Sequence, residues 1–377
     1  MRILICPDKF AGTLSAPEVA AAVTQGWHSV VPADETVARP LADGGPGFVE
    51  VLAGATGGRR IPVRTVDPLG RPAEGEVLVV GDTAYVESAQ ACGLHLLSTA
   101  ERDPKTTTSY GLGLLVAAAV ETGVRRIVLG LGGSATNDCG GGMLAALGAA
   151  PVDAAGLALP YGGAALAAAE GLGGTPRLRG VELVAATDVD SPLTGLHGAS
   201  NVFGPQKGAT REDVLLLDAA LERFADVLAH ALPDCPPGLT ALPGAGAAGG
   251  LGAAVLALGG RCESGIALVT RVIGLDEALD AADLVITGEG SFDHQSLRGK
   301  VVTGVAGSAR DRGIPCVVVA GRVSTGRREA AVAGITETYS LVDHFGGEER
   351  GGVEAAMTRP ADGLREIAAD LARQWSR

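Results

Sequence analysis

The sequence predicts an α/β protein with two domains, one of them Rossmann-like and discontinuous along the chain. The chain has 377 residues, more than a single core usually holds. Hydrophobic residues make up 46% of it but aromatic residues only 3%, so Val, Leu, Ile and Ala must form the core. Short apolar runs alternate with helical segments, and glycine-rich turns join them. This alternation is typical of parallel sheets with crossover helices.

The N-terminal end predicts a strand–helix–strand unit. Arg2–Cys6 is a short apolar strand, and Glu35–Pro40 is the next strand along the chain. Between them, Ser15–Glu18 has the capping-box pattern and begins a helix that extends to about Val31. Connections of this kind make the two strands parallel.

The C-terminal end predicts a second unit of the same kind. Asp283–Thr287 is an apolar strand that ends in a loop at Gly288–Asp293. A helix from about Lys300 to Arg312 and a strand at Cys316–Ala320 follow. We therefore expect residues 1–65 and 285–377 to share one parallel sheet in a Rossmann-like domain.

Residues 66–284 predict an inserted domain of mixed α/β structure. Val77–Val80 and Ala84–Ser88 form a hairpin around a two-residue turn, and Arg126–Leu129 and Glu182–Ala186 are further strands. Thr210–Asp213 begins a long helix. Its apolar residues recur at helical spacing and predict one buried face, at Leu217, Leu221, Phe224 and Leu228.

Composition excludes several classes of function. A net charge of −13 does not favour nucleic-acid binding. The six cysteines are scattered with no Cys-x-x-Cys pair, so zinc and thioredoxin-like sites are not expected and the thiols are predicted to be reduced. The N-terminal segment is not expected to be a signal peptide, and glycines with Pro243 interrupt the uncharged stretch 238–260. We expect a cytoplasmic monomer or homodimer that acts on a small molecule, with no membrane or nucleic-acid partner.

The most informative motif is the glycine-rich segment Gly130–Gly142. It follows a predicted strand and precedes a predicted helix, where backbone N–H groups can converge on an anion. The residues that we expect to bind the phosphates of a nucleotide are Gly132, Gly133, Ser134, Thr136, Asn137 and Asp138. The alternative is a tight connection whose glycines serve backbone geometry alone.

A second glycine-rich loop, Pro243–Gly252, carries no side chain that could do chemistry. Two interpretations stay open. Gly246, Gly249 and Gly250 let the backbone approach a nucleotide, or they permit close packing of the following helix.

Aspartates follow several predicted strands, as catalytic groups do in α/β enzymes. They are Asp8, Asp43, Asp188, Asp190 and Asp293, although Asp is also a favoured turn residue. With the glycine-rich loops they suit phosphoryl transfer, which needs positioned phosphates, a metal held by carboxylates and a base at the acceptor hydroxyl. We expect Asp188 to be the base and Asp190 or Asp293 to hold magnesium. The P-loop and protein-kinase motifs are absent from the sequence.

Lysine is scarce in this chain relative to arginine, and an acidic protein needs local positive charge where an anionic substrate binds. The four lysines, Lys9, Lys105, Lys207 and Lys300, each lie beside Pro or Gly in a loop-like motif. Lys9 is the leading candidate for substrate binding and catalysis, because it follows the first strand. The alternative is that Lys9 pairs with Asp8 or Asp43 and only shapes the loop.

The motifs taken together resemble the bacterial glycerate kinase family of type 1. The matching segments occur in family order over nearly the whole chain: 7–16, 42–45, 107–111, 132–138, 201–209, 243–252 and 288–300. The resemblance implies transfer of the ATP γ-phosphate to glycerate with magnesium, giving 2-phosphoglycerate. A 3-phosphoglycerate product, a kinase for a related small hydroxy acid and a regulatory protein without catalysis are the alternatives. In this interpretation, the residues that bind glycerate are Asp8, Lys9, Asp43, Lys207, Arg298 and Lys300.

The chain departs from the family pattern at four positions. Lys9 stands where the family usually has Ser, and Ala11 where it has Lys. Pro46 replaces a usual Glu, and Ser291 replaces a usual Arg. These changes leave the acceptor preference open.

Overall fold

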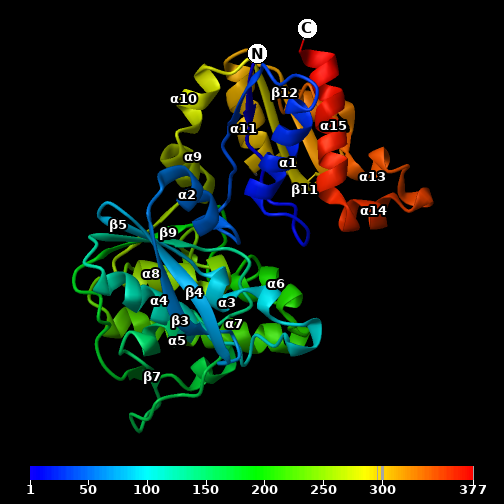
Figure 1. The fold of residues 1–377 in the computed structure, drawn as a ribbon. Helices are drawn as coiled ribbons and strands as arrows, with labels where there is room; N and C mark the ends of the chain where they lie inside the picture. Colours follow the sequence, from blue (N-terminus) through cyan, green and yellow to red (C-terminus); the bar gives the residue numbers. More distant parts are fainter. Residues whose placement is uncertain (295, 299–300, 377) are drawn as a thin grey trace. The chain divides into compact units, whose positions relative to one another are not determined.

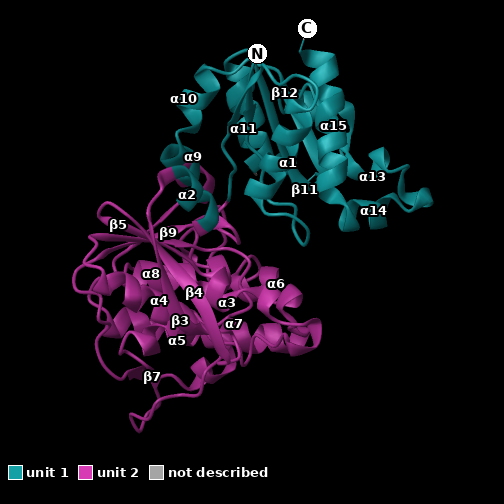
Figure 2. Cartoon of the chain, in the orientation of Figure 1, with its two compact units in different colours: residues 1–42, 50–55, 269–377 teal, residues 43–49, 56–268 magenta. Residues whose placement is uncertain are grey.

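The computed structural model describes residues 1–294, 296–298 and 301–376. The chain forms two compact units (Figure 2). Unit 1 comprises residues 1–42, 50–55 and 269–377, and unit 2 comprises residues 43–49 and 56–268. The α/β fold class that the sequence predicts is confirmed in both units.

Unit 1 is built on a five-stranded sheet in the order β13-β12-β11-β1-β2, and every neighbouring pair is parallel. Strands from the two ends of the chain therefore share one sheet, as expected. The strands are β1 (Arg2–Ile5), β2 (Glu35–Ala38), β11 (Leu284–Phe292), β12 (Cys316–Val323) and β13 (Glu337–Ser340). The helices are α1 (Ala16–His28), α10 (Leu275–Asp280), α11 (Val301–Asp311), α12 (Arg327–Val332), α13 (Leu341–His344), α14 (Gly352–Thr358) and α15 (Pro360–Trp375). Two further helices, α2 (Phe48–Thr56) and α9 (Gly265–Ile273), contain positions where the chain passes from one unit to the other.

The core of unit 1 lies between its sheet and the helices α1 and α15, which pack side by side (Figure 1). Ile3 and Ile5 of β1 face this layer, together with Trp27 of α1 and Leu364 of α15. All four side chains are fully buried. The alternation of strand side chains turns Leu4, which is also buried, to the opposite face.

Strand β11 is longer than the sequence predicts. The expected loop at Gly288–Asp293 is strand as far as Phe292, because Gly288, Glu289 and Ser291 pair in register with β12. A Cβ atom at Gly288 would lie 1.9 Å from the carbonyl oxygen of Val319. The glycine that indicated a turn is therefore required for close contact between two strands.

Unit 2 contains a six-stranded sheet in the order β10-β9-β6-β5-β4-β3. The first four strands are parallel, and β4 is antiparallel to both β5 and β3. The strands are β3 (Arg59–Val66), β4 (Pro72–Val80), β5 (Thr83–Glu87), β6 (Arg126–Gly130), β9 (Glu182–Ala186) and β10 (Arg261–Glu263), with a separate pair β7 (Pro151–Val152) and β8 (Gly171–Leu172). Because β3 pairs with β4, residues 59–65 lie in unit 2, whereas the expected domain boundaries stood at 65/66 and 284/285.

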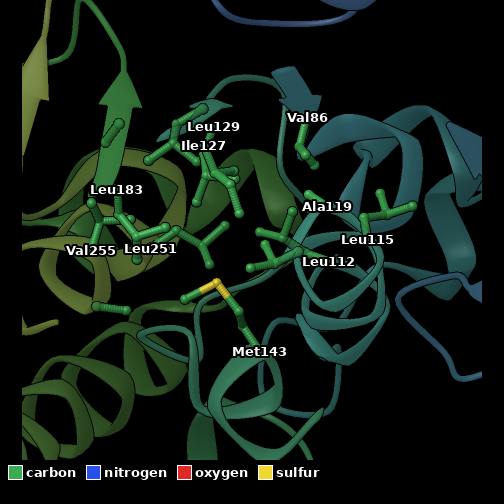
Figure 3. Packing of buried hydrophobic residues seen from close by; sticks show 14 of the residues in the cluster. Val86, Leu112, Leu115, Ala119, Ile127, Leu129, Met143, Leu183, Leu251 and Val255 are labelled. Carbon is green, nitrogen blue, oxygen red and sulfur yellow. The ribbon is translucent and has the colours of Figure 1, made fainter. Parts of the chain in front are cut away.

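Two hydrophobic clusters hold unit 2 together. Figure 3 shows the first, in which Leu112 and Leu115 of α4 (Tyr110–Glu121) and Leu251 of α8 (Ala247–Ala257) pack on Ile127 and Leu129 of β6. The second forms around α7, where the predicted face of Leu217, Leu221, Phe224 and Leu228 is fully buried. The helices are α3 (Ala89–Cys92), α4 (Tyr110–Glu121), α5 (Gly141–Ala146), α6 (Ala199–Phe203), α7 (Arg211–Ala231) and α8 (Ala247–Ala257).

Candidate functional site

The carboxyl ends of four parallel strands in unit 2 lie at one edge of the sheet. Glu87 of β5 is in register with Gly130 of β6, Gly130 with Ala186 of β9, and Ala186 with Glu263 of β10. The loops that follow these strands therefore begin side by side. Ligands of open α/β sheets bind outside the carboxyl ends of the strands, which makes this edge the candidate site.

The segment 43–49 crosses this edge and is fixed there by backbone contacts. The amide groups of Gly47 and Val49 both donate to the Glu87 carboxylate, at 3.1 and 3.2 Å. Gly44 has φ +92°, and a Cβ atom there would lie 2.4 Å from the carbonyl oxygen of Ala186. A Cβ atom on Gly132 would similarly lie 2.7 Å from Gly45 Cα. The glycines of both segments are thus needed for close packing of one loop on the other.

Asp188 and Asp43 are brought together at this edge. Asp188 accepts a hydrogen bond from Ser264 Oγ at 2.6 Å and another from the amide of Ile266 at 3.1 Å. Burial raises the pKa of the Asp188 carboxyl, and the negative charge of Asp43 raises this pKa further, against the opposing effect of those hydrogen bonds. A carboxylate whose pKa is raised accepts a proton more readily than an ordinary aspartate.

The glycine-rich loop after β6 has a row of amide groups that bond to no protein acceptor. Its other amide groups are engaged: Leu131 donates to Ala186, Ala135 to Cys92 and Cys139 to Gly249. Among the described residues, no acceptor is present for the N–H groups of Gly132, Gly133, Ser134, Thr136, Asn137 and Asp138. Gly133 is exposed and Gly132 partly buried, but the other four residues are buried. Buried backbone donors are nearly always satisfied in folded proteins, so this row of amide groups points to water or to a bound anion.

Two side-chain atoms of the same loop are also unsatisfied. Thr136 Oγ1 and Asn137 Oδ1 are buried and have no hydrogen-bond partner in the described structure. Asn137 uses its Nδ2 atom to donate to Ser200 Oγ at 2.9 Å. The neighbouring Thr107 hydroxyl, by contrast, donates to the Ala135 carbonyl at 3.0 Å.

Lys207 lies directly behind this loop, and its side chain is almost completely buried, with 2% exposure. Its ammonium group donates to the Thr136 carbonyl at 2.7 Å and to Ser134 Oγ at 3.0 Å. Burial lowers the pKa of Lys207 to about 8, and the negative charge of Asp138 opposes this shift. The sequence marked Lys207 as a substrate-binding candidate; the structure places it against the candidate phosphate loop.

Asp138 has a structural role that accounts for its burial. Its carboxylate accepts hydrogen bonds from the amide and hydroxyl of Ser109, both at 2.8 Å, and from the amides of Gly142 at 3.2 Å and Gly140 at 3.3 Å. It thereby joins the start of α4 to the start of α5. Burial is nevertheless strong enough to raise the pKa of Asp138.

The second glycine-rich loop packs against the first. A Cβ atom at Gly249 would lie 1.9 Å from the Thr136 carbonyl oxygen, and one at Gly250 would lie 2.8 Å from Cys139 Cα. A Cβ atom at Gly246 would lie 2.2 Å from the Pro192 carbonyl oxygen. All three glycines are therefore required for close packing of this loop on its neighbours, and its contact with a nucleotide stays a prediction.

Several sequence candidates lie in unit 1. Asp8 and Lys9 follow β1, are partly buried, and form an ion pair with 3.6 Å between Lys9 Nζ and Asp8 Oδ1. Asp293 follows β11, and its carboxylate accepts from the amide of Ser296 at 3.3 Å. Arg298 lies in a short 3-10 turn, and Lys300 lies outside the described residues.

Sequence reasoning missed Glu87 and Ser264, which fix the positions of segment 43–49 and of Asp188. The only available signal was their place at or just after a strand end.

Asp190 is exposed on the loop that follows β9. In the part of the chain that the structure describes, no group of three or more His, Cys, Asp or Glu side chains is placed to hold a metal ion. None of the described helices is long and apolar enough to cross a membrane.

Fold and site together define an α/β protein whose candidate site is a glycine-rich loop at the carboxyl edge of a parallel sheet. Residues 3–376 match the glycerate kinase family. The glycerate 2-kinase of Escherichia coli (strain K12) is 40% identical over 378 residues, which cover 99% of this chain and 98% of that protein. The glycerate kinase of Bacillus subtilis (strain 168) is 41% identical over 380 residues, covering 99% and 97%.

A solved structure agrees with these relatives. A provisionally assigned glycerate kinase 2 from Salmonella typhimurium LT2 superposes with a TM-score of 0.82 at 39% identity, covering 99% of this chain and 98% of that one. The chain therefore belongs to the glycerate kinase family, and the enzyme is a kinase. The resemblance stated from the sequence is confirmed.

Proposed function

We propose that this enzyme transfers the γ-phosphate of ATP to a hydroxyl of D-glycerate and produces 2-phosphoglycerate. The relatives of the same length that are named for glycerate phosphorylation support the substrate, and the Escherichia coli relative named as a 2-kinase supports the product. The observation that carries the proposal is the loop after β6, where amide groups of 132–134 and 136–138 have no acceptor among the described residues.

The loop fits the phosphates of ATP by its donor chemistry. Phosphoryl transfer depends mainly on positioning and on stabilising charge at the phosphate oxygens. The loop amide N–H groups, the hydroxyls of Ser134 and Thr136, and the ammonium of Lys207 are all donors. They all lie in one unit, and Ser134, Thr136 and Lys207 are buried. A kinase requires such a set around the groups that carry the developing charge.

Asp188 is the proposed general base. In this role its carboxylate accepts the proton of the glycerate hydroxyl as that oxygen bonds to the γ-phosphorus and the bond to the β-phosphate oxygen of ADP breaks. Asp43 is the neighbouring carboxylate, and its charge raises the pKa of Asp188. The assignment of the base to Asp188 is therefore tested by substituting both aspartates. Lys9 is proposed to bind the glycerate carboxylate.

Magnesium is proposed as the metal, with Asp190 or Asp293 as a protein ligand. Magnesium sites in phosphate-transferring enzymes commonly use one or two carboxylates together with substrate phosphates, so a larger carboxylate cluster is not required. Asp190 is exposed and offers hard oxygen ligands. The metal would neutralise charge on the phosphate oxygens.

The cytoplasmic location and the monomer or homodimer state also stay predictions.

One coupled assay tests the substrate and the product together. The protein is incubated with Mg-ATP and D-glycerate, and the product is detected with enolase alone or with phosphoglycerate mutase plus enolase. A signal with enolase alone supports 2-phosphoglycerate. A signal that requires the mutase indicates 3-phosphoglycerate, and ADP formation only with another hydroxy acid indicates a different acceptor.

A further inference from the structure

We propose that Lys207 is a positioning residue for ATP, which holds the loop at 134–136 in its anion-binding shape and places a positive charge behind it. The inference rests on the proposed function and deepens it, because it assigns the source of charge at the phosphate loop. The sequence alone suggested only that Lys207 binds substrate.

The placement of Lys207 is specific. It ends a short 3-10 turn, Pro205–Lys207, that is closed by Gly208 at φ +99°. A Cβ atom at Gly208 would lie 2.1 Å from the carbonyl oxygen of Arg102, so this backbone is fixed against the chain that precedes α4. The side chain then extends into the interior, where its ammonium meets Ser134 Oγ and the Thr136 carbonyl.

The charge of Lys207 is left uncompensated at contact distance. Among the described residues no carboxylate forms a salt bridge with it, and its two hydrogen-bond partners are a hydroxyl and a carbonyl. Asp138 influences it electrostatically without direct contact. A buried ammonium without a paired anion is costly to maintain, so its presence beside unsatisfied amide groups indicates that the missing anion is a ligand.

The two contacts of Lys207 also explain how the loop keeps its shape. The ammonium draws the Thr136 carbonyl and the Ser134 hydroxyl inward, to the side where Lys207 lies. This fixes the peptide units whose N–H groups have no protein acceptor. A loop held in this way needs little rearrangement when phosphate binds, which favours affinity.

The competing explanation is that Lys207 only tethers the loop and does not interact with the ligand. The pH dependence of nucleotide affinity distinguishes the two explanations. The groups that face the ammonium are Ser134 and Thr136 by contact, and Asp138 and Cys92 at longer range. Burial lowers the pKa of Lys207 to about 8, so its charge is present at pH 7 and is lost as the pH rises through that value. Nucleotide affinity follows this change only if the charge serves the ligand.

The experiment measures ADP binding by calorimetry between pH 7 and 9.5 for the wild type and for Lys207→Met. We expect wild-type affinity to fall by about tenfold across this range, the size of one charge-assisted contact. Lys207→Met is expected to bind ADP at least about tenfold more weakly at pH 7 and to show no such fall. A thermal melt of the same variant checks that it is folded.

The matched control is Lys105→Met, since Lys105 lies in the same unit and pairs with Asp213 at 2.8 Å. It should keep both the affinity and the pH dependence of the wild type. Ser134→Ala, which keeps the lysine charge but removes one contact, should bind ADP more weakly and retain the pH dependence.

The inference is overturned if folded Lys207→Met binds ADP like the wild type, or if it keeps the pH-dependent fall. In either case the proposed function stands, provided that glycerate is still phosphorylated. A wild-type protein that binds no ADP would overturn the proposed function as well.

Discussion

The hydroxyl of Ser264 donates a hydrogen bond of 2.6 Å to the carboxylate of Asp188, and so joins the loop after β10 to the loop after β9. Ser264 also accepts from the amide of Ala267 at 3.2 Å in the first turn of α9. The proposed base is therefore oriented by the same residue that begins a helix. Asp188 itself contributes to that helix start through the amide of Ile266.

Removing this hydrogen bond should shift the pH dependence of catalysis. The bond favours the charged form of Asp188 and lowers its pKa, so Ser264→Ala raises that pKa. The acidic limb of kcat/KM should then move to higher pH, because the base is protonated over a wider acidic range. The matched control is Ser340→Ala, which removes a cap contact to the amide of Asp343 in unit 1. An unchanged acidic limb in Ser264→Ala would show that another group is the base.

Replacing Asp188 and Asp43 by asparagine, each in turn, should have different effects on kcat and on the pH dependence of catalysis. Asp188→Asn removes the proposed base and should lower kcat by about 10²–10⁴-fold with a modest change in ATP binding. Asp43→Asn removes the like charge that raises the pKa of Asp188, so its acidic limb should move to lower pH. If Asp188→Asn stays active while Asp43→Asn is inactive, the two roles are exchanged. Rate profiles of both variants over the same pH range provide the measurement.

Much of the fold follows from local sequence patterns. Arg126–Leu129 is strand because its apolar run is buried on both faces, and α7 is helix because Leu217, Leu221 and Phe224 recur at helical spacing. The loop after β6 was predicted for a similar reason, since polar residues among glycines at the end of a strand are a local signal. Such features need no knowledge of distant contacts.

The features that the sequence did not predict depend on contacts between distant segments. Gly288 indicated a turn but lies inside β11, because pairing with β12 decides its conformation. Segment 43–49 is held at the edge of unit 2 by Glu87, some forty residues away, which accepts its amide groups. The burial of Lys207 likewise depends on the fold of the whole unit. None of these contacts leaves a local pattern in the sequence.

Removing the unsatisfied hydroxyl of Thr136 should weaken ATP binding without lowering the free energy of unfolding. Thr136→Val has the same shape and removes an Oγ1 atom that has no partner in the described structure, so the free energy of unfolding should not decrease. The KM for ATP should rise several-fold if this hydroxyl contacts a phosphate oxygen. Thr107→Val is the paired variant, because it removes the 3.0 Å hydrogen bond to Ala135 and should destabilise by about 1 kcal/mol. Urea unfolding and ATP kinetics on both proteins test this contrast. Equal destabilisation of the two would contradict it.

Lys9 is expected to affect glycerate and not ATP. Its ammonium lies 3.6 Å from the Asp8 carboxylate, and both residues are partly buried at the end of β1. Lys9→Ala removes a charge-assisted contact worth about 1.5–3 kcal/mol, which corresponds to a rise of roughly tenfold or more in the KM for glycerate. The KM for ATP should barely change, and Lys105→Ala should change neither constant. If the KM for ATP rises instead, Lys9 belongs to the phosphate site. If neither constant moves, the ion pair with Asp8 serves only to shape the loop after β1.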